Sequence, residues 1–465
     1  MIHQFVFDDT YVVLDIFSGS IHLVDPVAYD MIGMYETSSQ EEAVAAMLQK
    51  YGDQPDVTRQ ELLDCWADIT QLKEEGKLFS EDVYEEVAKH YRRNQTDVKA
   101  LCLHVAHVCN LNCSYCFAAQ GTYQGKRGLM SLETGKAALD FLVTHCDSHK
   151  TLDVDFFGGE PLMNWEVVKA LVAYGRELEQ KYDKKIRFTL TTNGVLLDDE
   201  VTDFCNREMH NVVLSLDGRQ EVHDRFRKDL ENRGSYEKIV PKFQRFVSRR
   251  GEKSYYIRGT YTHYNTDFLQ DILHMADLGF RELSMEPVVC NPSDPCALTE
   301  EDLPVLKEQY EELAREMIRR NRRGDGFTFY HYMISLTGGP CIYKRVAGCG
   351  SGTEYLAVTP EGDLYPCHQF VGNEEYYMGN VSQGVTNTAL REKFAECNIY
   401  TRPACADCWA KLYCAGGCAA NAYHATGSIN GVYEYGCELF RKRIECALMV
   451  QLANKKHKNK RSCFN

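Results

Sequence analysis

Apolar and polar residues through the first 90 positions are arranged as short strands followed by helices. Three apolar runs bounded by turn residues predict β-strands: His3–Asp9, Tyr11–Phe17 and Ser20–Val24. Pro26 suits the first position of a helix, and two capping boxes, Ser39–Glu42 and Thr58–Glu61, precede the next two helical periods. We therefore expect three strands and three helices, in that order.

Further along, short apolar strands alternate with amphipathic helices. The expected strands are Ala100–Val105, Leu152–Phe157, Ile186–Thr191, Val212–Leu216, Tyr255–Tyr261 and Glu282–Val288. The expected helices include Leu132–Cys146, Trp165–Tyr182, Tyr236–Arg249 and Leu303–Arg323. Such alternation predicts an α/β fold with a parallel sheet, here a partial (β/α)6 barrel. From Cys341 onward cysteines become dense and the expected helices are short.

These patterns predict three domains. Residues 1–90 resemble a winged-helix fold, residues 91–335 form the partial barrel, and residues 336–465 form a cysteine-rich domain. A charged helix and linker, from Ser80 to about Asp97, joins the first two domains.

Composition restricts the possible partners. The net charge is −15, which argues against nucleic-acid binding, and the basic run Lys455–Arg461 is expected to be a solvated tail. No stretch approaches the roughly 20 apolar residues of a membrane span, and the start lacks a signal sequence. We therefore expect a cytoplasmic protein. Because the cytosol keeps thiols reduced, its 20 cysteines favour metal binding over disulfides.

The first cysteine motif directly follows the first barrel strand. Cys109, Cys113 and Cys116 have the spacing CxxxCxxC, which lets three thiolates hold three irons of a [4Fe–4S] cube. The fourth iron is then open to a substrate, as catalysis requires. The alternative is a zinc knuckle that lacks one ligand.

With Phe117 after the third cysteine, this motif resembles the signature of the radical S-adenosylmethionine (SAM) superfamily. The resemblance implies that the open iron chelates the amino and carboxylate groups of SAM. An electron from the cluster then cleaves SAM to methionine and a 5′-deoxyadenosyl radical, which abstracts hydrogen from the substrate.

Other strand ends support the resemblance. Gly158, Gly159 and Glu160 match the GGEP motif that holds the SAM amino group in this family, although an ordinary strand-to-turn signal is the alternative. By the same analogy, Asn193 and Ser215 face the SAM ribose and carboxylate. Arg227 is expected either to pair with the SAM carboxylate or to be a surface arginine. These residues follow the carboxyl ends of strands, where α/β barrels place active sites.

The second cysteine array resembles the SPASM domain, an extension found on radical SAM enzymes that modify peptides. Its seven cysteines are Cys349, Cys367, Cys405, Cys408, Cys414, Cys418 and Cys437. The resemblance assigns Cys405, Cys408, Cys414 and Cys437 to one auxiliary [4Fe–4S] cluster. It assigns Cys349, Cys367 and Cys418 to another. Three [4Fe–4S] clusters and SAM are therefore the expected cofactors, and zinc is the alternative metal because CxxC pairs also bind it.

Two auxiliary clusters need eight ligands, and the motif supplies seven. Either Cys341 is the eighth, or the first auxiliary cluster keeps an open iron that binds a substrate thiol. Cys290 and Cys296 follow the sixth strand and are further candidates to line the site.

As a whole, the chain resembles SCIFF maturases, which join a cysteine sulfur to the α-carbon of another residue in small cysteine-rich ribosomal peptides. The resemblance implies that residues 1–90 bind the precursor's leader as an added strand. It also implies a flavodoxin- or ferredoxin-type electron donor. One alternative is an anaerobic sulfatase-maturating enzyme, which needs a carboxylate base that the sequence does not identify. Another alternative is a non-catalytic iron–sulfur electron-transfer protein.

Overall fold

The computed structural model describes residues 1–89, 97–123, 125, 127–146, 149–291, 293–336 and 342–462, with side chains to residue 455. The chain divides into two compact units. Unit 1 comprises Met1–Tyr91, Ile334–Val346 and Asn398–Gly416. Unit 2 comprises Arg92–Met333, Ala347–Cys397 and Gly417–Asn465. The first predicted boundary, at residue 90, lies one residue from the end of the first segment of unit 1, whereas the cysteine-rich region is divided between the two units.

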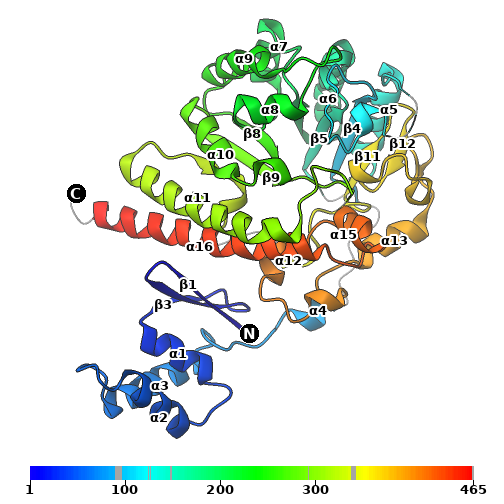
Figure 1. Cartoon of the computed structure of the whole chain (residues 1–465). Helices are drawn as coiled ribbons and strands as arrows, with labels where there is room; N and C mark the ends of the chain where they lie inside the picture. The colour runs from blue at the N-terminus through cyan, green and yellow to red at the C-terminus, as the bar shows by residue number, and fades with distance from the viewer. Residues whose placement is uncertain are drawn as a thin grey trace. The chain divides into compact units, whose positions relative to one another are not determined.

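Unit 1 has the three strands and three helices expected from the sequence (Figure 1). Its antiparallel sheet has the order β1 (Ile2–Phe7), β2 (Thr10–Asp15), β3 (Ile21–Val24). The helices are α1 (Pro26–Met34), α2 (Gln40–Tyr51), α3 (Arg59–Glu74) and the short α4 (Glu85–Lys89). Both predicted capping boxes form, so the starts of α2 and α3 are determined locally. Val13, Met31, Val44 and Leu62 are part of the apolar core between sheet and helices.

The barrel strands of unit 2 lie where the apolar runs predict them. They are β4 (Ala100–Ala106), β5 (Thr151–Gly158), β6 (Lys185–Thr192), β7 (Asn211–Ser215), β8 (Ser254–Tyr261) and β9 (Glu282–Pro287). Each pairs in parallel with the next, as a partial α/β barrel requires. The intervening helices are α5 (Leu132–Thr144), α6 (Trp165–Tyr182), α7 (Asp199–Glu208), α8 (Gln220–Phe226), α9 (Tyr236–Ser248) and α10 (Phe268–Asp277). The carboxyl ends of all six strands therefore meet along one edge of the sheet.

The cysteine-rich region continues this sheet. β11 (Tyr355–Val358) pairs in parallel with β4, and β12 (Asp363–Tyr365), β13 (Gly379–Asn380) and β14 (Gly384–Val385) follow as antiparallel strands. With β10 (Thr328–Phe329) beside β9, the sheet has eleven strands. The predicted second and third domains thus share one sheet within unit 2.

The end of the chain differs from expectation. α16 (Glu434–Ser462) is 29 residues long, so the prediction of only short helices after Cys341 is wrong. The basic run Lys455–Arg461, expected to be a solvated tail, lies within this helix. α16 runs beside α11 (Leu303–Arg323) and buries Leu439, Ile444 and Leu448 (Figure 1). This apolar stripe explains why the helix forms despite its charged end. The other helices of the region are α12 (Ile342–Ala347), α13 (Thr388–Glu396), α14 (Lys411–Cys414) and α15 (Ala419–Thr426).

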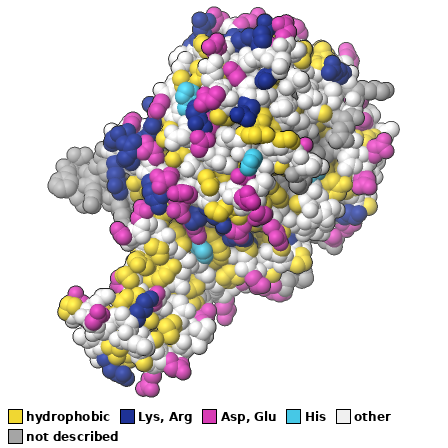
Figure 2. Space-filling model, in the orientation of Figure 1, with side chains coloured by type: hydrophobic (Ala, Val, Ile, Leu, Met, Phe, Trp, Pro, Cys, Tyr) yellow, Lys and Arg dark blue, Asp and Glu magenta, His cyan; other side chains and the backbone are white. Residues whose placement is uncertain are grey.

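The surface carries mixed charge. Figure 2 shows acidic and basic side chains interspersed over the visible face, in keeping with the net charge of −15. Among the described residues, no helix combines the length and the apolar character needed to span a membrane.

Candidate active site

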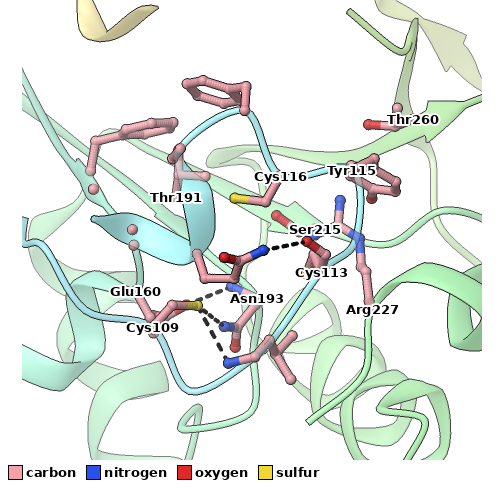
Figure 3. Close-up of a pocket in the computed structure, with 18 of the residues that line it drawn as sticks. Cys109, Cys113, Tyr115, Cys116, Glu160, Thr191, Asn193, Ser215, Arg227 and Thr260 are labelled. Atoms are coloured by element: carbon pink, nitrogen blue, oxygen red, sulfur yellow. Dashed lines mark hydrogen bonds between the residues drawn. The ribbon is translucent and has the colours of Figure 1, made fainter. Parts of the chain in front are cut away.

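The first cysteine motif lies in the loop after β4, and its three thiols border a cavity of about 250 Å³ in unit 2 (Figure 3). Cys109 Sγ accepts a hydrogen bond from the backbone N–H of Leu111 at 3.4 Å. Burial raises the pKa of Cys109 to about 12 and that of Cys113 to about 11. Binding to a metal reverses this preference because it stabilises the thiolate. Among the described residues, no three His, Cys, Asp or Glu side chains converge on a single metal ion. A cube makes a different demand, because each of the three thiolates binds a different iron.

The two glycines of the GGEP motif are needed for close backbone packing. Gly158 has φ = 121°, and a Cβ at either Gly158 or Gly159 would collide with the carbonyl oxygen of Ala106 or Val108. The N–H of Gly159 donates to Ala106 at 2.7 Å, and the N–H of Glu160 donates to Val108 at 2.9 Å. Small residues therefore let the end of β5 lie against the cysteine loop.

Glu160 is a buried carboxylate at the floor of the cavity. It accepts hydrogen bonds from Leu162 N–H at 3.0 Å, Thr192 Oγ1 at 2.8 Å and Asn193 N–H at 2.8 Å. All three donors are neutral, and burial raises the pKa of Glu160 to about 7. A buried carboxylate with neutral donors fits an ammonium ligand, because a cation would restore its ordinary ionisation. The site therefore fits the SAM amino group.

Asn193 connects the end of β6 to the cysteine loop. Its Nδ2 donates to Asn110 Oδ1 at 2.8 Å and lies 3.7 Å from Cys109 Sγ (Figure 3). Its Oδ1 accepts from Val195 N–H at 3.0 Å, so both ends of the amide are held. The side chain thus positions the loop as well as lining the cavity.

The Arg227 side chain is 13% exposed, so the alternative of a surface arginine is wrong. Its Nε and Nη2 donate to the two carboxylate oxygens of Asp217 at 2.8 and 3.0 Å. Tyr115 donates to the same carboxylate at 2.5 Å, and Thr260 N–H donates at 3.0 Å. Burial alone would raise the pKa of Asp217, but the Arg227 guanidinium holds it below the ordinary value. Asp217 therefore orients Arg227 at the edge of the cavity.

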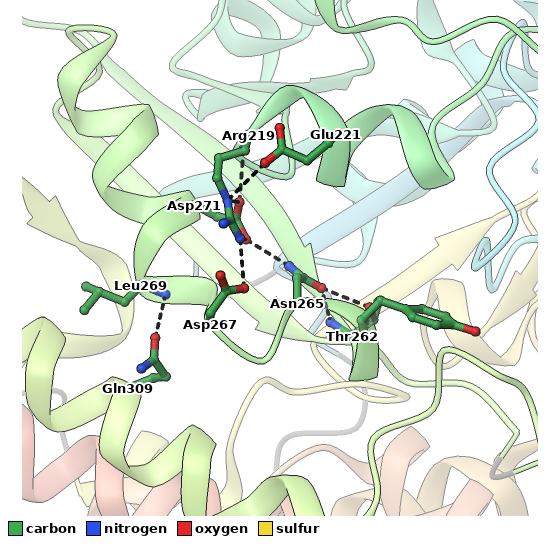
Figure 4. A network of polar contacts seen from close by, with 9 residues as sticks. Arg219, Glu221, Thr262, Asn265, Asp267, Leu269, Asp271 and Gln309 are labelled. Carbon is green, nitrogen blue, oxygen red and sulfur yellow. Dashed lines mark hydrogen bonds and ion pairs between the residues drawn. The ribbon is translucent and has the colours of Figure 1, made fainter.

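A second polar network supports the loop that carries Asp217. Arg219 donates to Asp271 through its backbone N–H at 3.0 Å and its Nε at 2.8 Å (Figure 4). Asn265 Nδ2 also donates to Asp271, at 3.1 Å. Gly218, which lies between Asp217 and Arg219, has φ = 108°, and a Cβ there would collide with Asp271. The turn after β7 is consequently fixed to α10.

All ten residues predicted for the SAM site line this one cavity: Cys109, Cys113, Cys116, Phe117, Gly158, Gly159, Glu160, Asn193, Ser215 and Arg227. They come from the loop after β4 and from the ends of β5, β6 and β7 or the segments that follow them. This convergence is the arrangement that their positions at strand ends predict.

Part of the cavity wall was not predicted from the sequence. Arg258, Thr260 and Glu286 line the cavity from β8 and β9, and His368 and Gln369 line it from the cysteine-rich region. Arg258 and Thr260 lie two positions apart on β8, and Thr260 pairs with Glu286 across the sheet. Period-two alternation along β8 and β9 was the available signal.

Cys290 borders a neighbouring cavity of about 470 Å³, together with Cys116, Phe117 and His368. Its Sγ lies 3.8 Å from Cys296 Sγ. Cys290 therefore lies beside the site without lining its cavity, and Cys296 is not among the residues that line either cavity.

The cysteines of the second array are divided between the two units, and the predicted ligand sets stay a prediction. Cys349, Cys367 and Cys418 lie in unit 2, where the first and last influence the pKa of the Cys367 thiol. Gln369 Nε2 lies 3.9 Å from Cys418 Sγ. Cys405, Cys408 and Cys414 lie in unit 1, and Cys437 is in the first turn of α16. Cys341 lies outside the described residues.

Comparison with known proteins agrees with this geometry. The radical SAM superfamily model matches residues 103–279, and the SPASM iron–sulfur cluster-binding domain model matches residues 349–409. The cyclopropyl synthase TigE of Paramaledivibacter caminithermalis is 22% identical over 74% of this chain and 72% of its own length. A cysteine-type anaerobic sulfatase-maturating enzyme of Clostridium perfringens is 25% identical over 74% of this chain and 95% of its own length.

Two solved structures share the fold. The structure of anSMEcpe with bound AdoMet and a peptide has a TM-score of 0.62 at 21% identity, covering 77% of this chain and 99% of its own. Streptococcus suis SuiB bound to S-adenosylmethionine has a TM-score of 0.52 at 14% identity, covering 92% of this chain and 97% of its own.

The domain matches and the ten residues around one cavity lead to the same conclusion. This chain contains a radical SAM domain and a SPASM domain, and its cofactors are SAM and [4Fe–4S] clusters, three of which fit this architecture.

Proposed function

We propose that this enzyme is a SCIFF-type peptide maturase, which joins a cysteine sulfur to the α-carbon of another residue in a cysteine-rich precursor peptide. The strand-and-helix domain at residues 1–89 is the observation that carries the proposal. The SuiB fold covers 92% of this chain, whereas the anSMEcpe fold covers 77%. A peptide-recognition role accounts for the additional domain.

The residues that line the cavity have distinct proposed roles. When bound, the clusters and SAM supply the radical that removes the α-hydrogen and accept the electron left after the sulfur–carbon bond forms. Cys109, Cys113 and Cys116 hold the cluster at which SAM is cleaved. Glu160 binds the SAM ammonium, and Arg227, oriented by Asp217, binds its carboxylate. Asn193 and Ser215 face the ribose and carboxylate.

Sulfatase maturation is the second candidate, and similarity to C. perfringens sulfatase-maturating enzymes favours it. That reaction needs a carboxylate base. Among the described residues that line the cavity, the carboxylates are Glu160 and Glu286. Glu160 accepts three hydrogen bonds, and Glu286 pairs with Arg443 at 3.1 Å and with His331 at 3.3 Å. Both are committed to other partners, which supports thioether formation over oxidation to formylglycine.

The partners follow from this assignment. The precursor's leader binds unit 1 by adding a strand to its sheet, and the cysteine-rich core enters the cavity of unit 2. A flavodoxin- or ferredoxin-type protein supplies electrons. Neither nucleic acid nor a membrane is a proposed partner, and the cytoplasm is the proposed compartment.

The test measures SAM cleavage and peptide mass together. Reduced, reconstituted enzyme should form 5′-deoxyadenosine from SAM. With the cysteine-rich peptide of a neighbouring reading frame as probe, it should lower the peptide mass by two hydrogens per crosslink. Replacing Cys109, Cys113 and Cys116 with alanine should abolish both products, whereas Cys65→Ala should retain them, because Cys65 lies in unit 1 away from the motif.

Each alternative has its own result. Conversion of a sulfatase-derived cysteine peptide to formylglycine, with the cysteine-rich peptide unchanged, would establish the sulfatase maturase instead. Absence of 5′-deoxyadenosine from fully loaded enzyme would favour a role in electron transfer alone.

A further inference from the structure

The 398–416 segment, which carries Cys405, Cys408 and Cys414, is built onto the N-terminal domain. Both belong to unit 1. The ring of His3 on β1 stacks on Trp409, with centroids 3.6 Å apart and an interplanar angle of 4°. Asn398 Nδ2 donates to the carbonyl oxygen of Ala88 at 3.4 Å. The domain proposed to bind peptide therefore also supports three proposed cluster ligands.

A buried ion pair lies at the centre of this contact. Lys411 is three residues from both Cys408 and Cys414, and its side chain is 5% exposed. Its Nζ lies 3.3 Å from Asp82 Oδ2, and the Asp82 side chain is 13% exposed. Tyr400 donates its hydroxyl hydrogen to the same carboxylate, with both oxygens at 3.0 Å. The charge of Lys411 is thus held by a residue of the N-terminal domain.

The ammonium also contacts the backbone of the 398–416 segment. Nζ donates to the carbonyl oxygen of Ala406, between Cys405 and Cys408, at 3.1 Å. It lies 5.1 Å from the ring centroid of Phe17 and 4.8 Å from that of Tyr400. Charge in such a desolvated position interacts strongly with other charges nearby. The reduction potential of an iron–sulfur cluster depends on the net charge around it and on its burial.

We propose that Asp82 and Lys411 form a charged link by which the N-terminal domain positions the 398–416 segment and sets the reduction potential of its cluster. The inference rests on the proposed assignment of Cys405, Cys408 and Cys414 as ligands. Reduction adds negative charge to a cluster, so the Lys411 ammonium favours the reduced form and the Asp82 carboxylate opposes it. Removing the ammonium should therefore lower the potential, and removing the carboxylate should raise it.

The experiment is a potentiometric titration of the full-length holoenzyme, followed by electron paramagnetic resonance. The relevant signal is identified by its loss in Cys408→Ala. Lys411→Met removes the charge and keeps most of the side-chain volume, and it should lower the potential. Asp82→Asn keeps an acceptor for Tyr400 and should raise the potential. Lys50→Met is the matched control, because Lys50 is 58% exposed and pairs with Asp30 between α2 and α1 of the N-terminal domain.

The link would be overturned if the reduction potential shifted in the same direction in both variants, or in neither, while the iron content stayed unchanged. Loss of about four irons from both variants, with retained helix content, would show that the pair only builds the segment and would overturn its effect on potential. Zinc instead of iron in the wild-type segment would contradict the ligand assignment rather than the link.

Discussion

Asp217 shows how a residue outside the predicted set of site residues can organise an active site. Its carboxylate is buried and receives hydrogen bonds from Arg227, Tyr115 and the backbone of Thr260. Arg227 would be a buried, uncompensated cation without it. Truncating the Asp217 side chain would therefore disturb both the local structure and the SAM-binding role proposed for Arg227. Replacing Asp217 with the neutral, equally large asparagine is more informative.

We predict that Asp217→Asn destabilises the protein and weakens SAM binding. An unpaired buried arginine costs about 3–5 kcal/mol, so the unfolding temperature should fall by several degrees. The KM for SAM should rise at least about tenfold, because Arg227 loses its orientation. Asp183→Asn is the control, since its side chain is 91% exposed and pairs with Lys150 at the surface. Unchanged stability and KM in Asp217→Asn would contradict the role of the pair.

For Asp155 on β5 we predict that loss of the charge stabilises the protein, in contrast to the destabilisation expected for Asp217→Asn. Burial raises its pKa to about 6, with a further contribution from the nearby Asp153. A carboxyl whose pKa is higher in the folded state loses stability as the pH rises from its unfolded value, near 4, through 6. Asp155→Asn should therefore stabilise the protein at pH 7.5 by about 1–3 kcal/mol. Thermal unfolding from pH 4 to 8 is the measurement, and a gain that does not fade on acidification would refute the explanation.

At the scale of elements, the sequence predicts the parallel strands well because each has apolar residues in a run or at alternate positions over at least five residues. β4 to β9 lie within two residues of their predicted bounds. The small strands β11–β14, of two to four residues, are too short to show a period. The pairing of β11 with β4 depends on segments about 250 residues apart, so no local pattern reveals it.

The same contrast holds within the active site. Cys109, Glu160 and Arg227 are predicted because each belongs to a local motif at a strand end. His368 and Gln369 reach the cavity from the cysteine-rich region, through tertiary packing. Their positions depend on how distant elements come together, which residue spacing does not encode.

The sheet of the N-terminal domain provides an element-scale prediction for leader binding. β1 and β3 are its two edges, and His3 of β1 stacks on Trp409. Leu23 on β3 is 39% exposed and Val6 on β1 is 47% exposed. Figure 2 shows apolar side chains on the visible face of this domain. Because β1 already contacts the 398–416 segment, we place the leader at β3.

We predict that Leu23→Glu weakens leader binding about tenfold, because it places a charge in an apolar contact. Val6→Glu is the matched control on the other edge and should bind normally. Fluorescence anisotropy with a labelled precursor peptide measures the affinity. Equal losses in both variants, or a loss confined to Val6→Glu, would place the leader elsewhere.

At the scale of the whole molecule, the three predicted groups of cluster cysteines draw on both compact units. If each group holds a cube, anaerobic reconstitution should give about twelve irons and twelve sulfides per chain. If a substrate thiol rather than Cys341 completes the first auxiliary cluster, we predict that Cys341→Ala retains all twelve irons. Adding precursor peptide should then change the resonance spectrum of wild-type enzyme. Cluster loss in the variant, with a wild-type spectrum indifferent to peptide, would identify Cys341 as the ligand instead.

The composition of unit 1 also bears on engineering. Its parts are separated by hundreds of residues in the sequence, yet the 398–416 segment packs on the first 91 residues. A chimera that exchanges only the N-terminal domain would leave Trp409 and Lys411 facing a foreign surface. If the N-terminal domain recognises the peptide as proposed, transfer of specificity requires a discontinuous graft, in which this domain is exchanged together with the 398–416 segment that packs on it.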